Sequence, residues 1–519
     1  MSNGRLDLSR ENITNVLTNN IVTIVFVVFV VAGYFAAPGI SVSGLLSEVI
    51  SRFFRNGLLV VALIIPVMAG LGLNFGIVVG ALAAVLAIIP IRYHGIGGMG
   101  GLMLCFLIAL PIALLFGYLT GKLYNKTRGQ EMIAGIIVSF FAEGLFLIFV
   151  LFVIGGIIPV EAGHPMVIPR TEEGIAVPGV GIRSAFDMGA HPTHPVALRD
   201  PDHVAGLSNS MDFLFQIDFF VGLLLLSVGV LIFMTLRRML ASKNKSIHKS
   251  SKPVFALKCG FWVLFALVAI HGILMPNGMV FWFPAIGFGF QLPASPLQGT
   301  TTLPVVTGLV ILAFCLFTTY FTKTKLGQDC RSVGQSQHIA NASGINVDRT
   351  RIIATMISTV LGAWGMIIFL QNMGTVSTYT AHRQIGMFSV AALLVGGATA
   401  AKAGVKNAML GILLFHAMFV VSPGVGRLLF GDELLAEATR NFMTYGVIGL
   451  SLGLHVWKTR KAAERELLKD AFDSEPPKDG GNDGTKHDPP APDDSSETYK
   501  DDVLGDLASE MIGDTKDIV

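Results

Sequence analysis

The chain has 519 residues, of which 52% are apolar and only 14% are charged, and its formal net charge is +2. A soluble protein of this length needs many more charged side chains to cover its surface. Together with a mean hydropathy of +0.65, the composition excludes a soluble globular fold and predicts an all-α polytopic membrane protein. The four cysteines lie in apolar runs or basic stretches, which argues against disulfide bridges and a cysteine metal site.

A polar N-terminus, 1–20, precedes the first apolar run, and no small-residue cleavage site follows that run, so we predict a retained span. A helix needs about 20 mostly apolar residues to cross a bilayer, and by this measure we predict about ten to twelve spans in a transmembrane domain over 21–457. The apolar runs are 21–37, 57–73, 75–90, 101–121, 133–158, 213–236, 258–283, 303–322, 351–370, 385–401, 404–421 and 441–457.

Two pairs of runs, 57–73/75–90 and 385–401/404–421, are interrupted by glycine and polar residues, which predicts two broken or re-entrant helices. Small residues in spans usually allow close helix packing. Interrupted segments at corresponding places in two halves also indicate a translocation site. The stretches 70–84 and 395–414 form such a pair, so we take Asn74, Gly76, Gly396 and Gly397 as candidates for the translocation path.

The basic residues indicate the orientation of the spans. They gather in 122–128, 237–258 and 323–351 and directly after 457. With an even number of spans, these loops lie on one side with both termini, and excess Lys and Arg mark the cytoplasmic side. The acidic loop 159–212 then lies outside.

The external loop contains four histidines beside several aspartates, and imidazole with carboxylate can bind zinc. Pro192 and Pro195 interrupt any helical face and no spacing repeats, so we favour a polar docking loop and expect no metal site. The four residues are His164, His191, His194 and His203.

The C-terminal stretch 458–519 is rich in Pro, Gly, Asp and Ser, and we predict a cytoplasmic, mostly disordered tail. Val503, Leu507 and Met511 have helical spacing near its end, where we favour a transient helix over a docking helix.

A phosphate-binding loop is missing. The nearest approach, FGYLTGKL at 116–123, lacks the first Gly and the final Ser or Thr of the nucleotide-binding pattern and ends a predicted span. We therefore expect no enzymatic activity and no cofactor on this chain, and any ATP that powers it must be hydrolysed by another polypeptide. We also expect no nucleic-acid partner.

A few polar residues lie inside apolar runs, where ionisable groups usually face the protein interior or a cavity. Glu143 is the most isolated, and it is either a contact for substrate or protons or a buried structural carboxylate. A proton-coupled carrier is expected to have several such acids. Trp364 can stack on a sugar or base, whereas Phe281, Trp282 and Phe283 fit interfacial anchoring better. The other intramembrane polar residues are His271, Gln371, Asn372, Lys402 and His416.

The segment 323–350 is polar and basic and lies between two long apolar runs. Gly327 and Gly344 mark turns around a stretch that can form a short helix. Such a segment is what a transporter offers to a soluble partner, although a plain basic cytoplasmic loop satisfies the same pattern.

Three stretches, 324–351, 357–377 and 390–420, together with GLNFGIVVGALAAVLA at 72–87, resemble the permease subunits of bacterial ABC importers for ribose, nucleosides and branched-chain amino acids. The resemblance implies a permease homodimer or heterodimer in the inner membrane, a pair of ATPase subunits and an external substrate-binding protein. It also implies that 324–351 holds the cytoplasmic coupling segment. The coupling residues are then Gly327, Arg331, Val333, Gly334, Gly344, Ile345 and Asn346.

The chain departs from the family pattern at Ser332 and at 335–337, and its external loop and tail are long. From the resemblance, a sugar or nucleoside is the first expectation for the solute, with branched-chain amino acids or a vitamin as alternatives. Two other classes remain open. An ion-coupled secondary transporter would work without an ATPase, and a membrane-embedded enzyme would place paired acids or histidines on facing helices.

Overall fold

The computed structural model describes the greater part of the chain up to residue 453. The described residues are 21–36, 42–172, 175–177, 179–189, 206–212, 216–243, 252–274, 279–283, 288–292, 302–446, 448–450 and 453. The predicted C-terminal tail, with Val503, Leu507 and Met511, lies outside the described residues.

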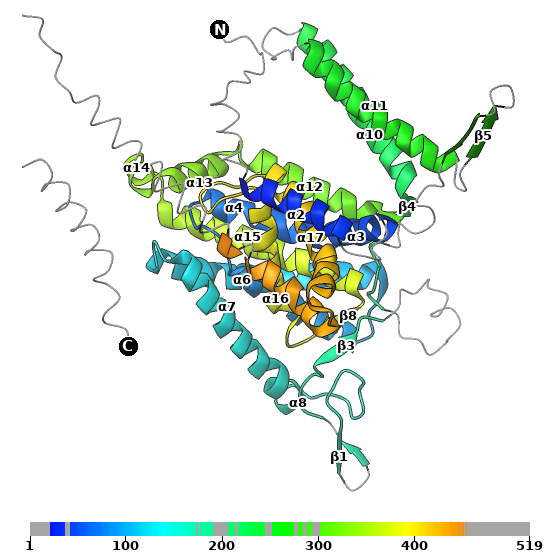
Figure 1. The fold of residues 1–519 in the computed structure, drawn as a ribbon. Helices are drawn as coiled ribbons and strands as arrows, with labels where there is room; N and C mark the ends of the chain where they lie inside the picture. Colours follow the sequence, from blue (N-terminus) through cyan, green and yellow to red (C-terminus); the bar gives the residue numbers. More distant parts are fainter. Residues whose placement is uncertain are drawn as a thin grey trace, which may run out of the picture. The chain divides into compact units, whose positions relative to one another are not determined.

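Helices dominate the described residues, which confirms the all-α fold (Figure 1). They are α2 (Ile21–Ala36), α3 (Val42–Ala62), α4 (Ile64–Met68), α5 (Ile77–Tyr93), α6 (Gly98–Lys126), α7 (Glu131–Ile148), the π-helical turn η1 (Phe149–Val153), α8 (Ile154–Gly156), α10 (Phe219–Lys243), α11 (Lys252–Leu274), α12 (Val305–Phe321), α13 (Lys325–Gln335), α14 (Gln337–Ala342), α15 (Val347–Met373), α16 (Ala381–Val395) and α17 (Val405–Phe430). Residues 433–446 are also helical.

The strands are short and form four antiparallel pairs. The pairs are β1 (Arg170–Glu172) with β2 (Ile175–Val177), β3 (Ala185–Asp187) with β8 (Thr375–Ser377), β4 (Gln216–Asp218) with β7 (Thr302–Pro304), and β5 (Met279–Phe283) with β6 (Phe288–Leu292). The β3–β8 pair joins the predicted external loop to the end of α15, so this loop is anchored to the helical bundle.

Six helices of the described chain are long and apolar enough to cross a membrane, or seven if the bent pair α12–α13 counts as one span. Four further apolar helices are shorter. Among them, α5 follows the first predicted interruption and α16 precedes the second. The multi-pass membrane character is confirmed. The count of ten to twelve spans, which includes such short helices, stays a prediction.

Several predicted span limits were wrong. The first half of α3, from Val42, was missed because Glu48, Arg52 and Arg55 interrupt its apolar pattern. The run 258–283 does not form one helix, because α11 ends at Leu274 and 279–283 form strand β5. Pro276 lies between the two, and the residue before a proline disfavours the helical conformation.

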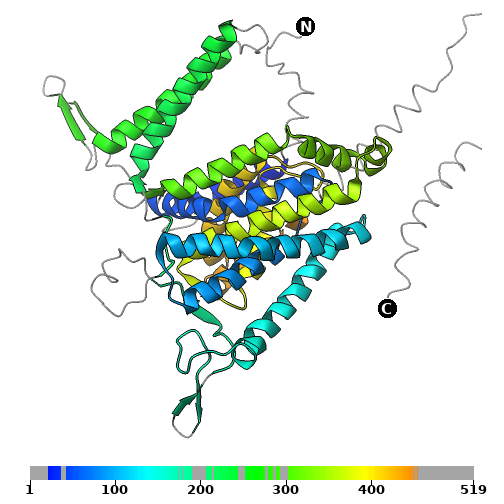
Figure 2. The same ribbon diagram turned by 180° about the vertical axis from the view of Figure 1, so that it is seen from behind.

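The core forms around α5, whose residues are buried on nearly every side. α15 packs against α3, α5 and α6, and α16 and α17 pack against each other and against α3. Viewed from behind, α6 and α15 run side by side, while α7 diverges from α6 (Figure 2). Segments from both ends of the sequence therefore share one apolar core.

Candidate functional site

The polar segment 323–350 folds into two short helices, α13 and α14, with a capping side chain at each start. The Thr324 hydroxyl accepts a hydrogen bond from the Gly327 amide at 3.2 Å, and the Ser336 hydroxyl accepts one from the Ile339 amide at 3.3 Å. Asn346 caps α15 in the same way, at 2.9 Å from the Arg349 amide. Such caps satisfy backbone donors that a helix start leaves unpaired, so the corners of this segment are well defined.

Two glycines let the segment pack closely. α13 bends away from α12 by 72°, and a Cβ atom on Gly327 would lie 1.9 Å from the Phe321 carbonyl oxygen. A Cβ atom on Gly334 would lie 2.2 Å from the Met68 carbonyl oxygen. α13 therefore contacts the end of α4 with its backbone.

A small apolar cluster holds the segment together. Val333, Ala340 and Val347 are buried with Ile345 against them, and Gly344 turns the chain into α15 with φ = +80°, a conformation that favours glycine. Arg331 and Asn346 are exposed. The segment is thus a fixed unit with a polar outer face, to which Ile339, 67% exposed, adds one apolar side chain.

The predicted interruption between the runs 57–73 and 75–90 is a true break, which lies between α4 and α5. Gly70 and Gly72 have positive φ angles of 73° and 66°. At the break, the Tyr124 hydroxyl donates to the Asn74 side-chain oxygen at 2.8 Å, and the Asn74 amide donates to the Ser358 hydroxyl at 3.3 Å. Asn74 is therefore buried and links the break to α6 and α15 through hydrogen bonds.

Other polar groups satisfy free backbone carbonyls at the break and at the junction of α3 and α4, as a membrane interior requires. At the break the Ser139 hydroxyl donates to the Phe75 carbonyl at 3.0 Å, and at the α3–α4 junction the Ser358 hydroxyl donates to the Ala62 carbonyl at 2.8 Å. A Cβ atom on Gly76 would lie 2.4 Å from the Tyr124 hydroxyl oxygen. The network therefore requires glycine at this position.

Glu143 lies at the wall of a cavity of about 250 Å³ next to this break. Its carboxylate is buried and accepts hydrogen bonds from Arg383, whose Nε lies at 3.3 Å. The Arg383 side chain is 59% exposed. The cavity is also lined by Phe75, Ser139, Phe140, Met387 and Tyr445. The ion pair fits a structural carboxylate and the cavity fits a solute contact, so both interpretations of Glu143 remain open.

His382 adds a second polar group behind this pair. Its Nε2 lies 3.8 Å from the Glu143 carboxylate, and its ring packs edge-on against Phe146 at 5.6 Å. It is fully buried, and neither ring nitrogen has a hydrogen-bond partner among the described residues. Three ionisable side chains, Glu143, His382 and Arg383, therefore lie together, and Glu143 and Arg383 line the cavity.

The second predicted interruption forms a tight turn between α16 and α17. A Cβ atom on Gly396 would lie 1.9 Å from the Asn407 carbonyl oxygen, and the Asn407 amide donates to the Gly396 carbonyl at 2.8 Å. Gly397 has φ = +82°. Lys402, in the same turn, is exposed.

One groove of about 480 Å³ is lined by both predicted interruptions and by the polar segment 323–350. Gly70 to Gly72 line it from the first interruption, Ala400 and Ala401 from the second, and Gly334 from α13. The sequence predicts a pairing of 70–84 with 395–414, and the turns of both stretches line this groove. A shift of α13 would act directly on the first broken segment, since a Cβ atom on Gly334 would lie 2.2 Å from the Met68 carbonyl oxygen, and it would reshape a groove that the second broken segment also lines.

The remaining predicted polar residues lie apart from this groove. The Trp364 indole donates to the Phe106 carbonyl at 3.3 Å and packs against Phe106 and Phe314. It does not line the Glu143 cavity. His416 is buried between Phe415 and Phe419, and His271 is half-buried in α11.

Gln371 and Asn372 anchor the external loop. The Gln371 side-chain oxygen accepts from the Met211 amide at 3.2 Å, and the Asn372 amide donates to the buried Asp212 carboxylate at 2.8 Å. His164 packs against Tyr93 with ring centroids 4.2 Å apart. The other three histidines of the loop and the side chains of 281–283 lie outside the described residues.

The sequence analysis missed a second ion pair, which is buried and lies where α15 follows the polar segment 323–350. Arg351 is fully buried and donates to Glu131, and its guanidinium also donates to the Tyr124 carbonyl at 3.1 Å. Arg351 ended the polar segment and was counted only as a cytoplasmic base. Arg383 was missed as well, because it lies just before the apolar run 385–401. Glu143 itself was a signal for such a partner, since a buried carboxylate is stable only when a cation or hydrogen-bond donors lie next to it.

Comparison with known proteins gives one family and one relative. Residues 204–452 match the family described as branched-chain amino acid transport system / permease component. This range contains 324–351, 357–377 and 390–420 but not the N-terminal stretch 72–87. The nucleoside ABC transporter permease protein NupB of Lactococcus lactis subsp. cremoris (strain MG1363) is 27% identical over 136 residues, which cover 25% of this chain and 35% of that protein. The match thus spans about a third of the relative's length. No solved structure matches.

Proposed function

We propose that this chain is the membrane subunit of an ATP-binding cassette importer, because residues 204–452 match the family described as branched-chain amino acid transport system / permease component. It moves a small polar solute inward by alternating access while a separate ATPase hydrolyses ATP. The relative's name favours a nucleoside as solute, and a sugar is the next choice. The inner membrane, with both termini in the cytoplasm, is the proposed location.

The observation that supports the proposal is the groove that Gly334 of α13 lines together with the turns of both broken segments. A closing ATPase dimer must move a rigid element of the permease, and the capped, glycine-packed helix pair α13–α14 is such an element. Its exposed Arg331 can pair with an acidic groove on the partner. The partners are two ATPase subunits, a second permease subunit and an external substrate-binding protein.

We further propose that Asn74, Gly76, Glu143, Gly396 and Gly397 shape the path. Glu143 and Arg383 line its cavity, Asn74 and Gly76 fix the first break, and the two glycines fix the second. Trp364 supports the path through packing. An ion-coupled carrier is the alternative, and it predicts uptake by vesicles that contain this chain alone.

The test is stimulation of ATP hydrolysis in vesicles that contain the chain, the P-loop ATPase encoded beside it and the neighbouring exported binding protein. We expect Arg331→Glu to lower the stimulated rate at least about tenfold, because a charge-assisted contact becomes a repulsive one. Arg237→Glu is the matched control, as it reverses an exposed charge in the other large basic loop.

Normal stimulation in Arg331→Glu would refute the role of α13, and loss in Arg237→Glu alone would transfer that role to the loop at 237–258. Absence of any ATPase and binding-protein gene nearby would count against the importer itself. Thermal-shift screening of the binding protein would then identify the solute.

A further inference from the structure

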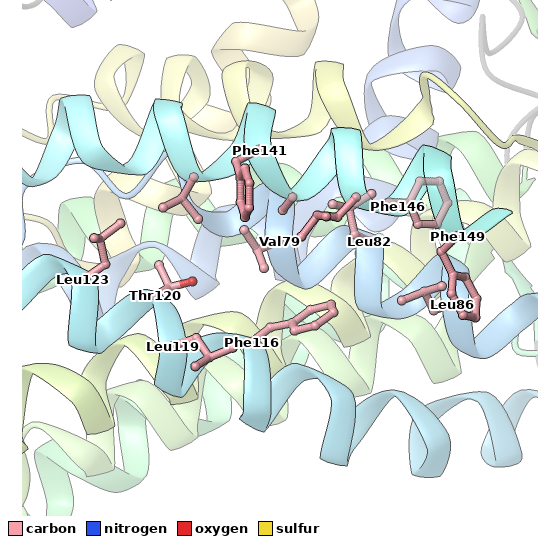
Figure 3. Close-up of a pocket in the computed structure, with 13 residues that line it drawn as sticks. Val79, Leu82, Leu86, Phe116, Leu119, Thr120, Leu123, Phe141, Phe146 and Phe149 are labelled. Atoms are coloured by element: carbon pink, nitrogen blue, oxygen red, sulfur yellow. The ribbon is translucent and has the colours of Figure 1, made fainter. Parts of the chain in front are cut away.

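A second and larger cavity lies between α5, α6 and α7, away from the polar groups described above. Its volume is about 550 Å³, within the range of roughly 300–1,000 Å³ that small-molecule sites occupy. Side chains of α6 and α7 point into it from both sides, with α5 behind (Figure 3). Among its lining residues, the one polar side chain is Thr120.

The cavity runs from the lipid-facing surface to a buried floor. Leu119, Phe141 and Leu145 at its rim are 55%, 66% and 53% exposed, on two helices that are long and apolar enough to cross the membrane. Leu82 and Phe146 at its floor are 1% and 4% exposed. Such a crevice at membrane depth excludes water and polar solutes, because it offers them almost no hydrogen-bond partners.

One end of the cavity is positively charged. α6 continues past Leu123 to Lys126, which is about 4.5 Å further along the axis, and Lys122 lies on the same turn. Both lysines are exposed, and neither has an ion-pair partner among the described residues. Arg128, by contrast, pairs with Asp348.

We propose that this cavity holds one acyl chain of an anionic phospholipid, with the headgroup at Lys122 and Lys126. An acyl chain matches the apolar walls, and two ammonium groups without an ion-pair partner match an anionic headgroup, although the Lys122 ammonium also lies 4.7 Å from the centre of the Tyr118 ring. A helix of a second copy, about 10–12 Å wide, would meet the rim but leave the floor unfilled.

The bound chain supports the helix that carries Glu143. On α7, Ala142 and Phe146 line this cavity, whereas Glu143 lines the polar cavity. On α5, Val79 lines this cavity and Val78 lines the polar one. The proposed lipid therefore fills the space on the opposite side of α7 and α5 from the ion pair. The proposal depends on the membrane character of the chain and not on the transport function.

The test is native mass spectrometry of the full chain released from bilayer discs of equal phosphatidylglycerol and phosphatidylcholine. We expect the wild type to retain phosphatidylglycerol with roughly tenfold preference, owing to the two lysines. Ala142→Phe places a ring in the cavity and should lose the retained lipid, whereas Ala266→Phe, in α11, should keep it.

The headgroup has its own variants. Lys122→Gln with Lys126→Gln changes only exposed side chains, so the fold is retained, and the preference for phosphatidylglycerol should disappear. Lys258→Gln, an exposed lysine on α11, should leave it unchanged. Wild-type lipid retention in both cavity and lysine variants would overturn the proposal. The proposal would also be overturned if the Ala142→Phe protein kept its lipid but no longer cross-linked to a second copy of the chain. In that case a helix of the second copy would occupy the cavity.

Discussion

At the scale of single residues, the pair Glu143–Arg383 is the most informative contact of the protein. An isolated carboxylate at membrane depth is costly, and here the carboxylate is buried while the guanidinium reaches the cavity. The negative charge is therefore held in place and the positive charge remains partly available. If the cavity lies on the proposed path, a polar solute could exchange contacts with Arg383 while Glu143 keeps the Arg383 side chain oriented.

We predict that Glu143→Gln lowers transport about tenfold or more, because a charge-assisted hydrogen bond contributes roughly 1.5–3 kcal/mol. Initial uptake rates in vesicles that contain the complete complex would measure the effect. Glu437→Gln is the control, since that carboxylate pairs with Arg440 at an exposed position. Uptake at the wild-type rate would leave Glu143 with a structural role only.

Residues such as Glu143 and Asn74 could be predicted from sequence because each interrupts an apolar run. Their partners could not. Tyr124 and Ser358, which bind Asn74, lie 50 and 284 residues away along the chain, and no periodicity relates such distances. The role proposed for Asn74 changed accordingly, from a residue that lines a path to one that holds the break in shape.

At the scale of elements, the two breaks and the polar segment 323–350 have a common construction, in which glycine allows backbone to approach backbone. Gly and polar residues within apolar runs predicted both breaks. That both breaks line one groove could not be predicted, because it depends on how α16 and α17 pack against α3 and how α16 packs against α5. The first half of α3 was missed for a related reason, since its charged residues interrupt the apolar pattern on which the span prediction relied.

We predict that Gly334→Ala separates ATP hydrolysis from transport. The new methyl carbon would clash with the Met68 carbonyl, so α13 must shift away from the first break while its outer face stays intact. The ratio of solute moved to ATP hydrolysed should fall several-fold, measured in the same vesicles.

Gly344→Ala provides the comparison for this prediction. Gly344 has open space around it and a positive φ, so alanine there costs about 1–2 kcal/mol of backbone strain without moving α13. Its thermal stability should fall while its ratio of transport to hydrolysis stays unchanged. Equal ratios in Gly334→Ala and wild type would show that the α13–α4 contact transmits no force.

At the scale of the whole molecule, the described bundle combines the matched region 204–452 with elements that precede it. α15, from the matched region, packs against α3, α5 and α6, so the two regions share one core. Composition alone predicted the membrane fold, because few charges remain to cover a soluble surface. Composition could not indicate which helices meet, since every apolar helix face is equally suited to lipid and to another helix.

The last prediction concerns the sides of the membrane. α15 has 27 residues, a length of about 40 Å, so α14 at its start and strand β8 at its end lie on opposite sides of a bilayer. From the positions of the basic loops we predict that α14 lies in the cytoplasm. In a protein whose native cysteines are replaced, Glu161→Cys should react with a membrane-impermeant maleimide on intact cells, as Glu161 is exposed in the predicted external loop 159–212. Asn341→Cys, exposed in α14, should react only after permeabilisation, in cells that lack the ATPase partner and cannot shield it. Labelling of Asn341→Cys on intact cells would show that the orientation is the reverse of the predicted one. α13 and α14 would then lie outside the cell, where no ATP-hydrolysing subunit could bind them.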